Sequence, residues 1–537
     1  MIASAFDHHE LTPSVLARQA TWETTGVVAD VAMERVALWG DPGTPELADR
    51  VGWLTLPIRY DDVRADLVAV RTWAASEAFD EIVVLGMGGS SLAPEVMGLA
   101  LPGERTLRVV DTTHPGAIQR LMPSDPSRTG FIVSSKSGGT LETLSLFAHA
   151  WDAIAAVTDT PGNHFVAVTD PGSSLADLAG ERGFAHVALA DPNVGGRYSA
   201  LTAFGLVPAA AAGIDTEALV AAAERVVLGP DPSHPGVVLG AQWGEAALAG
   251  RDKLTIITSD SLRSLPSWIE QLVAESTGKS DTGIVPVPTP PSERQDIWGQ
   301  DRVVLFLDTD ADPLTTTTSV APSAHLRLTN VTDLGAAMYV LEVATAFAGA
   351  VLEIHPFNQP DVQLAKDLAK QALAGELAVS GMRSLDSTDP AVGPELSAFL
   401  ANHRDGDYAV VLAYLDANDE TTRQLESLTS RIRAMTGLPT VLQIGPRYLH
   451  STGQLHKGGP NTGLFIEIVD TPTPDLPIPG QEFTFGELVT AQALADYAAL
   501  EQRGRRVIRL RAEPAATEAL QRVNALLATE AVRSSDD

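Results

Sequence analysis

Residues 131–153 read FIVSSKSGGTLETLSLFAHAWDA, in which an apolar run and an amphipathic run are joined by Ser, Lys, Gly and Thr. The first run is typical of a buried strand and the second of a helix. Ser135, Ser137 and Thr140 offer hydroxyl groups, the two glycines allow close approach to the backbone, and a helix N-terminus adds free N–H groups. The stretch therefore predicts a strand–turn–helix unit that binds a phosphate or a similar anion. The alternative is a capped turn, in which the hydroxyls only satisfy backbone donors.

Strand-like runs recur on both sides of this stretch, and each is followed by a turn and a helix-like segment. Alternation of this kind predicts βαβ units and a parallel sheet. The first group of runs lies at 81–87, 107–111, 130–135, 164–170 and 186–190. A candidate linker, GPDPSHPG, follows at 229–236. Beyond it the pattern resumes, and we expect a second parallel sheet from the runs at 253–259, 302–308, 325–330, 408–415 and 440–445.

The predicted fold class is α/β, with two domains that are each a parallel sheet flanked by helices, a three-layer sandwich of flavodoxin type. A chain of 537 residues is too long for a single core. We expect a helical N-terminal segment at 1–75, a first domain with the phosphate-binding turns at 76–230, a second domain at 237–435, and a C-terminal segment at 436–537 that packs on the second domain.

The composition restricts the possible partners. The chain has 37 Lys and Arg against 68 Asp and Glu, a net charge of −31, which argues against nucleic acid and anionic membranes as partners. It has no cysteine, which excludes disulfides and thiolate chemistry and fits a reducing compartment. The N-terminal residues lack a basic segment followed by an apolar one, and we expect no apolar stretch long enough to span a bilayer. We therefore expect a cytoplasmic, unanchored protein.

A second strand–turn–helix junction, VVLGMGGSSLAPEV at 83–96, allows a rival interpretation. Its glycines, together with Asp111 at the end of the next strand, superficially resemble a dinucleotide-binding fingerprint, as in a nicotinamide-dependent dehydrogenase. However, Ser91 stands where that fingerprint needs Gly or Ala. Two hydroxyl-rich turns in one domain suit a single phosphate better than a pyrophosphate and a ribose.

Five motifs follow one another along the chain: GMGGSSLAPEV (86–96), SSKSGGTLET (134–143), DPNVGGRYSALTAFGLVPAA (191–210), WIEQLVAESTGK (268–279) and PFNQPDVQLAK (356–366). Their order and spacing resemble the phosphoglucose isomerase family, whose members have two sugar-isomerase (SIS) domains. The resemblance implies an aldose–ketose isomerase of glycolysis and gluconeogenesis. Such an enzyme interconverts glucose 6-phosphate and fructose 6-phosphate through a cis-enediol, with no cofactor and no metal.

The resemblance also implies which residues move the proton. Gln271 and Glu275 lie one helical turn apart on one face, just before the helix-breaking STGKS. From its local sequence alone, Glu275 would be interpreted as a surface carboxylate. The resemblance, however, implies that it occupies the position of the family's catalytic base. Arg197 follows two glycines and could form a structural ion pair. The resemblance implies that it stabilises the enediolate, with Gly196 allowing close approach.

The phosphate-binding positions of the family match both glycine-rich turns. They are Gly88, Gly89, Ser90, Ser135, Lys136 through its backbone, Ser137 and Thr140. One departure is Gly139, where many relatives have Thr, so one hydroxyl is missing from this turn.

The family's ring-opening histidine is absent from its usual place, because residues 284–302 contain no histidine. The segment LHSTGQLHKGG at 449–459 resembles that missing segment, and we infer that His450 fills the role. His355 and His456 are the alternative candidates. The histidine segment could also be only a solvated turn without a catalytic role. Gln359 and Lys366 lie seven residues apart, two helical turns on one face, and match the family's substrate-binding glutamine and catalytic lysine.

Two alternative functions remain open from the sequence. One is an SIS-domain isomerase for another phosphosugar such as mannose 6-phosphate, and the other is a non-catalytic sugar-phosphate sensor. The expected partner is a phosphosugar substrate. The resemblance further implies a homodimer, because sites of this family borrow a residue across the subunit interface.

Overall fold

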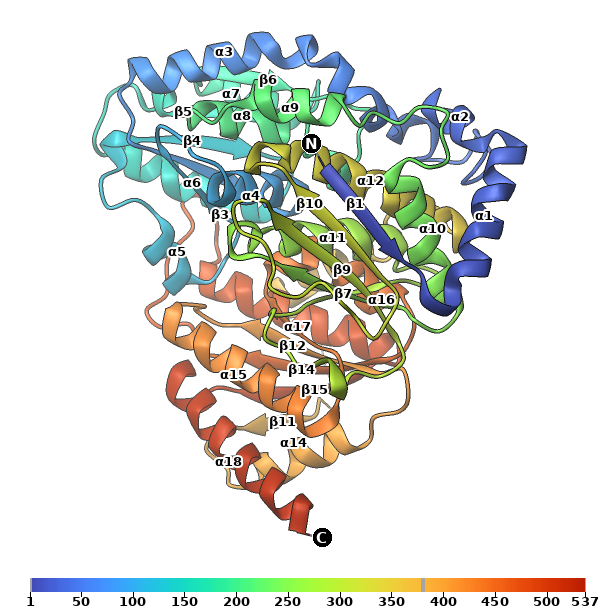
Figure 1. Ribbon diagram of the computed structural model, residues 1–537. Coiled ribbons are helices and arrows are strands. Elements are labelled where there is room, and N and C mark those ends of the chain that lie inside the picture. Colours follow the sequence, from blue (N-terminus) through green and yellow to red (C-terminus); the bar gives the residue numbers. More distant parts are fainter. Residues whose placement is uncertain (1, 378–381, 537) are drawn as a thin grey trace.

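Three sheets organise the protein. The computed structural model describes residues 2–377 and 382–536. Within these residues the chain forms three five-stranded sheets flanked by helices, which confirms the predicted α/β class. In Figure 1 the first sheet, in blue and cyan, and the second, in green and yellow, lie above the third, in orange and red.

The first sheet contains all five of the first group of predicted strands. It is parallel throughout, in the order β3–β2–β4–β5–β6. Its strands are β2 (Glu81–Gly86), β3 (Thr106–Val110), β4 (Thr129–Ser134), β5 (Phe165–Thr169) and β6 (His186–Leu189). The helices of this region are α3 (Asp61–Ser76), α4 (Leu92–Ala100), α5 (Pro115–Leu121), α6 (Leu141–Ala155), α7 (Ser174–Glu181), α8 (Ala203–Ala211) and α9 (Thr216–Glu224).

The second sheet contains a strand that the sequence did not predict. Its order is β1–β10–β9–β7–β8, with β1 (Ile2–Asp7) antiparallel to β10 and the other pairs parallel. The expectation of helix from the first residue is therefore wrong for β1, which pairs along its whole length with the edge of the sheet. The other strands are β7 (Lys253–Thr258), β8 (Val285–Pro288), β9 (Arg302–Thr309) and β10 (Ser323–Leu328). The helices of this region are α1 (Thr12–Thr25), α2 (Val27–Ala32), α10 (Pro235–Leu248), α11 (Leu265–Thr277) and α12 (Leu334–Val351), whereas α13 (Val362–Leu373) packs on α17 (Phe485–Gln502) of the third region.

The third sheet corrects the expected strand grouping. The runs at 408–415 and 440–445 do not join the second sheet, because they pair with strands from the C-terminal part of the chain. The order is β11–β15–β14–β12–β13, all parallel. β12 and β13 pair across position 435, where we expected a domain limit. The strands are β11 (Ser384–Asp386), β12 (Tyr408–Tyr414), β13 (Thr440–Ile444), β14 (Gly463–Val469) and β15 (Arg506–Arg511), and the helices are α14 (Val392–Ala401), α15 (Asp419–Thr436), α16 (Gly453–Gly458), α17 (Phe485–Gln502) and α18 (Ala516–Asp536).

The helix α12 is the apolar centre of the main core. The stretch Val331–Val351, which is α12 with the turn before it, is long and apolar enough to cross a membrane, so the expectation that no such stretch exists is wrong. However, 94% of its most apolar 18-residue window is buried inside the protein. Gly240 on α10 explains part of this close packing, because a Cβ atom there would lie 2.6 Å from Ala344 O on α12. We therefore assign α12 as a core helix.

The third sheet region packs on both of the others. Phe485 and Leu488 of α17 belong to the same apolar cluster as the strands of the first sheet. Tyr408 and Val410 of β12 share a second cluster with Val287 of β8. The expected packing of the C-terminal segment on the second domain thus extends to the first, and the turn before α16 lies where all three regions meet.

Candidate active site

The predicted phosphate-binding turn lies between β4 and α6. Ser135 Oγ and Thr140 Oγ1 are 3.0 Å apart across it. Thr140 holds the N-cap position of α6, but its side chain makes no capping hydrogen bond. Ser137 Oγ accepts a hydrogen bond from the Gly139 N–H at 3.3 Å, as the capped-turn alternative expects, whereas Thr140 satisfies no helix donor. The free N–H groups at the start of α6 and the hydroxyl pair are thus available to an anion.

Two other residues of this turn act differently from their neighbours. The Lys136 side chain is engaged by Asp170, whose Oδ2 lies 2.6 Å from Nζ, so the expected role through the Lys136 backbone stays a prediction. A Cβ atom on Gly139 would meet no atom within 4 Å. The departure from Thr at this position therefore has no steric cause in the described residues.

The glycine turn after β2 makes backbone contacts with two other turns of the site. A Cβ atom on Gly89 would lie 2.0 Å from Gly196 O. One on Gly88, whose φ is +56°, would lie 2.5 Å from His450 O. Only glycine permits such approaches at both positions. The two glycines therefore let the turns that carry Arg197 and His450 close on the first sheet.

The dinucleotide interpretation fails at Asp111. It requires a free carboxylate for a ribose, but Asp111 Oδ2 accepts a hydrogen bond from Ser91 Oγ at 3.1 Å. Arg447 Nη1 lies 3.4 Å from the same carboxylate, which is 8% exposed. Asp111 is therefore committed to contacts within the protein. The neighbouring Ser90, predicted to bind phosphate, is buried beside the glycines.

Glu275 and Arg197 form a buried ion pair. Glu275, near the end of α11, has Oε1 2.8 Å from Arg197 Nη1, and their side chains are 12% and 2% exposed. The Arg197 guanidinium also donates to Gln359 Oε1 and Ser276 Oγ, and to two carbonyls of the segment 356–358. Its five N–H groups thus have five acceptors, which fixes the plane of the guanidinium. The two side chains lie in contact, which also fits the structural ion pair that the sequence left open for Arg197, so their catalytic roles stay predictions.

Gln271 connects this ion pair to the histidine segment. Its Nε2 donates to Glu275 Oε2 at 3.1 Å and to the backbone oxygen of His450 at 2.9 Å. The one-turn spacing on α11 places both side chains on the same face, as predicted. One amide group thereby joins residues from the second and third sheet regions.

A cavity of about 320 Å³ adjoins this cluster. It is lined by residues of the phosphate turn, α6, α13, the histidine segment and α17, including Ser137, Gly139, Thr140, Glu142, Lys366, Lys370, His450 and Gln492. The phosphate turn, Lys366 and His450 therefore face one space. Glu275, Gln271, Arg197 and Gln359 do not line this cavity, and their connection to it runs through the Gln271–His450 hydrogen bond.

His450 is paired with a carboxylate that sequence reasoning missed. Its Nε2 lies 2.9 Å from Glu142 Oε1, which also accepts a hydrogen bond from Gln492 Nε2 at 2.7 Å. Burial raises the pKa of Glu142, but His450 and Lys366 outweigh it, so the pKa lies below its usual value. Glu142 is therefore a buried anion that can orient the imidazole.

The two alternative histidines lie elsewhere. His355 Nε2 is 3.1 Å from Pro45 O, and this residue does not line the cavity. His456 is 3% exposed, and burial holds its pKa well below the usual value. Of the three candidates, the geometry favours His450.

Glu142 stands in the quoted segment, in the first turn of the predicted helix. Its place directly after the phosphate turn could have marked it as a site residue. Gln492 gave no such signal, because it reaches the site only through the packing of α17.

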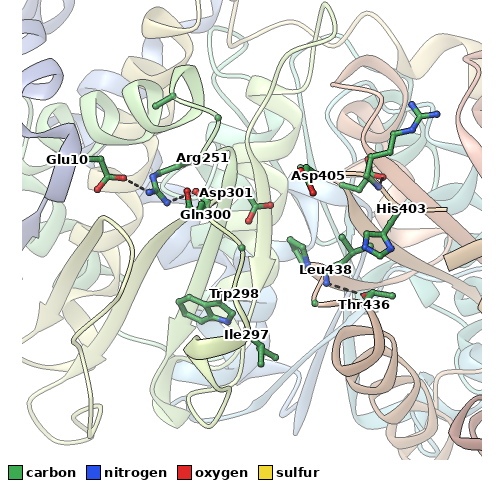
Figure 2. Close-up of a pocket in the computed structure, with 18 of the residues that line it drawn as sticks. Glu10, Arg251, Ile297, Trp298, Gln300, Asp301, His403, Asp405, Thr436 and Leu438 are labelled. Atoms are coloured by element: carbon green, nitrogen blue, oxygen red, sulfur yellow. Dashed lines mark hydrogen bonds and ion pairs between the residues drawn. The ribbon is translucent and has the colours of Figure 1, made fainter. Parts of the chain in front are cut away.

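A second hollow lies away from these residues. It measures about 840 Å³. Figure 2 shows Glu10 and Arg251 on one side of it and His403, Asp405 and Leu438 on the other. No predicted catalytic residue is among the described residues that line it. Among residues 2–377 and 382–536, no group of three or more His, Asp or Glu side chains is placed to hold a metal ion.

The fold is that of a sugar-isomerase protein. A solved structure of a hypothetical protein from Thermus thermophilus matches with a TM-score of 0.58 and 26% identity, over 70% of this chain and 100% of that one. A glucose-6-phosphate isomerase from Chlamydia trachomatis has the same fold, with a TM-score of 0.50 and 22% identity, over 64% of this chain and 77% of that one. The chain therefore shares the α/β fold of these two structures.

Sequence relatives specify the family. The phosphoglucose isomerase family model matches residues 65–287. A glucose-6-phosphate isomerase from Rubrobacter xylanophilus is 30% identical over 383 residues, which are 60% of this chain and 88% of the relative. One from Thermus thermophilus is 28% identical over 404 residues, 63% of this chain and 92% of the relative. The chain belongs to the phosphoglucose isomerase family.

Proposed function

We propose that this protein interconverts glucose 6-phosphate and fructose 6-phosphate through a cis-enediol. The observation that carries the proposal is the buried contact between Glu275 and Arg197, which Gln271 connects to the His450 segment beside the hydroxyl-rich phosphate turn. Relatives named glucose-6-phosphate isomerase support the same reaction. They do not favour another phosphosugar or a non-catalytic sensor, and a sensor has no use for a buried base.

The phosphate turn and the start of α6 would hold the substrate phosphate. His450, oriented by Glu142, and Lys366 would move a proton between the ring oxygen and the anomeric hydroxyl, which opens the ring. These two residues lie outside the part of the chain that the family model matches, so their contribution rests on their position around the cavity.

Glu275 would then take the proton from C2 of the open aldose and return it to C1. Negative charge develops on the enediolate oxygens during this transfer, and the fixed guanidinium of Arg197 can stabilise it. Arg197 Nη1 lies 2.8 Å from Glu275 Oε1, so the guanidinium also holds the carboxylate in place.

The test is a coupled assay of the purified protein. Fructose 6-phosphate is supplied, and glucose 6-phosphate is detected by its oxidation with a dehydrogenase and NADP⁺. We expect activity without an added metal and its near abolition in Glu275→Gln, with phosphosugar binding retained in calorimetry. A wild-type protein that binds fructose 6-phosphate but forms no glucose 6-phosphate would refute the proposal.

We also propose a cytoplasmic homodimer with no nucleic acid or membrane partner. The net charge of −31 supports the absence of polyanionic partners. The dimer rests on the resemblance to the family, whose sites borrow a residue across the subunit interface. Analytical ultracentrifugation tests the dimer, and a monomer at micromolar concentration would contradict it.

A further inference from the structure

His450 reaches the site from a different region than the phosphate turn. It ends the turn Arg447–His450, which follows β13 of the third sheet, whereas the phosphate turn and Glu142 belong to the first sheet. The distance between the imidazole and Glu142 therefore depends on how the third region is held against the first. A side chain that fixes this docking next to His450 would control ring opening without contact to the substrate.

Arg447 makes such a contact three residues before His450. Its Nη1 donates to Glu95 Oε1 at 2.9 Å, and its Nη2 bonds the second oxygen of the same carboxylate. Glu95 lies on α4 of the first sheet region. A two-point bond between a guanidinium and a carboxylate fixes direction as well as distance.

The same guanidinium is tied to the glycine turn of the site. Arg447 Nη1 is 3.4 Å from Asp111, and Asp111 accepts a hydrogen bond from Ser91 Oγ at 3.1 Å. Gly88 O also lies 3.1 Å from Ser91 Oγ, as a second acceptor for the single proton of that hydroxyl. Because Gly88 packs directly on the His450 backbone oxygen, these contacts form a closed ring that returns to the histidine.

The residue after Arg447 holds the turn from the opposite side. The Tyr448 hydroxyl donates to Asp496 Oδ2 at 2.6 Å, within the third region. The turn is thus bonded to its own region through Tyr448 and to the first region through Arg447. Together these two contacts fix the position of the backbone that carries the His450 side chain.

We propose that Arg447 is a positioning residue for ring opening, which sets the His450 imidazole against Glu142 by bonding Glu95 and Asp111 across the junction of the two regions. The inference rests on the proposed isomerase function. It adds a residue that neither the family model, which ends at residue 287, nor the five sequence motifs include.

A second ion pair across the same junction provides a matched control. Arg120 of α5 donates to Asp416 Oδ1, just after β12, at 2.8 Å. It joins the same two regions but has no contact with the histidine turn among the described residues. Arg120→Met therefore tests docking in general, and Arg447→Met tests docking at His450.

The experiment compares wild type, Arg447→Met, Arg447→Lys and Arg120→Met on two substrates. Glucose 6-phosphate needs ring opening, whereas erythrose 4-phosphate cannot cyclise. We expect Arg447→Met to lower kcat for glucose 6-phosphate by about 10²-fold, as for a catalytic group displaced by an ångström, and to change erythrose 4-phosphate isomerisation far less. Arg447→Lys should recover part of the loss, since it keeps the charge but not the fork. Arg120→Met should match wild type.

Equal losses on both substrates, or a loss in Arg120→Met as large as in Arg447→Met, would overturn the inference. If Arg447→Met fails to fold, Glu95→Gln and Arg447→Lys decide by the same comparison. The imidazole NMR signal of His450, assigned with His450→Ala, gives a readout independent of activity. This signal should shift in the Arg447 variants and not in Arg120→Met. The absence of a shift in the Arg447 variants would refute the inference. This readout decides even if the wild-type protein is inactive and the proposed function fails.

Discussion

Glu142 Oε1 lies 2.9 Å from His450 Nε2, although 308 positions separate the two residues in the chain. The contact joins the first turn of α6, directly beside the phosphate-binding turn, to the third sheet region. The imidazole that we propose for ring opening is thereby supplied with an orienting carboxylate. The cavity that both residues line also contains Lys366, so an acid–base group and a cation face the same space.

Glu142→Gln should therefore impair ring opening selectively. The substitution keeps the size of the side chain but removes the negative charge that orients and stabilises the imidazolium. We expect kcat for glucose 6-phosphate to fall, though by less than the roughly 10²–10⁴-fold typical of a lost acid or base. Steady-state kinetics of Gln492→Glu provide a second test, because that variant places another carboxylate against Glu142 Oε1 and should also be impaired. Wild-type kcat in Glu142→Gln would exclude the orienting role.

Arg197→Lys should lower kcat more than it raises KM, because charge develops on the enediolate only during the reaction. The structure adds an effect on stability. Five acceptors surround the guanidinium, and an ammonium has three donors, so at least two acceptors lose their partner. Each buried acceptor left unpaired costs about 1–3 kcal/mol. Thermal unfolding should show a lower Tm, and an unchanged Tm would mean that the pocket is more accommodating than these contacts indicate.

Much of this arrangement could be predicted from local sequence. The quoted segment does form a strand, a turn and a helix, as β4 and α6 show, because an apolar run next to an amphipathic run specifies burial on its own. The pairing of strands could not be predicted in the same way. β12 and β13 have the same apolar character as β7 and β9, yet they belong to another sheet. An apolar run encodes that a strand is buried, not which strand lies beside it.

The same limit applies to the site. Glu275, Gln271 and Arg197 were found because they stand in motifs, and Gln271 and Glu275 also share a helix face. Gln492 and Arg447 act through contacts between segments that are hundreds of residues apart. Their local sequences, an Ala-rich helix and a short turn, do not indicate that Gln492 contacts Glu142 or that Arg447 contacts Glu95.

The two hydroxyls of the phosphate turn allow a direct test of substrate binding. Ser135→Ala with Thr140→Ala removes the pair that lies 3.0 Å apart. Each lost hydrogen bond to a charged group costs about 1.5–3 kcal/mol, so KM should rise by roughly 10²-fold or more while kcat changes less. Michaelis–Menten kinetics measure this. An unchanged KM would place the phosphate elsewhere.

Gly89→Ala should disrupt the meeting of the turns. A Cβ atom there would lie 2.0 Å from the backbone oxygen of Gly196, and backbone cannot move aside as a flexible side chain can. We expect a lower Tm and loss of activity. Gly180→Ala in α7 is the matched control, because its Cβ atom would meet nothing within 4 Å and Ala favours a helix. Equal behaviour of the two variants in thermal unfolding and activity would contradict the prediction.

The histidine itself separates ring opening from proton transfer when the two substrates are compared. Glucose 6-phosphate is mostly cyclic, so a protein acid and base must shuttle a proton between the ring oxygen and the anomeric hydroxyl before Glu275 can act. In erythrose 4-phosphate the only hydroxyl that could close a five-membered ring carries the phosphate. His450→Ala should therefore cut activity on glucose 6-phosphate by roughly 10²–10⁴-fold and activity on erythrose 4-phosphate far less. Glu275→Gln should abolish both.

Two results of that comparison would count against His450. If His450→Ala leaves glucose 6-phosphate turnover intact while His355→Ala or His456→Ala destroys it, another histidine opens the ring. The structure argues against this, because His355 bonds a carbonyl outside the cavity and His456 is buried beside Tyr408. If His450→Ala reduces both substrates equally in a folded protein, its role lies in proton transfer or in holding the site together. Folding is then checked by Tm, and the Gln271 hydrogen bond to the His450 backbone, which the substitution retains, makes a folded variant the expected outcome.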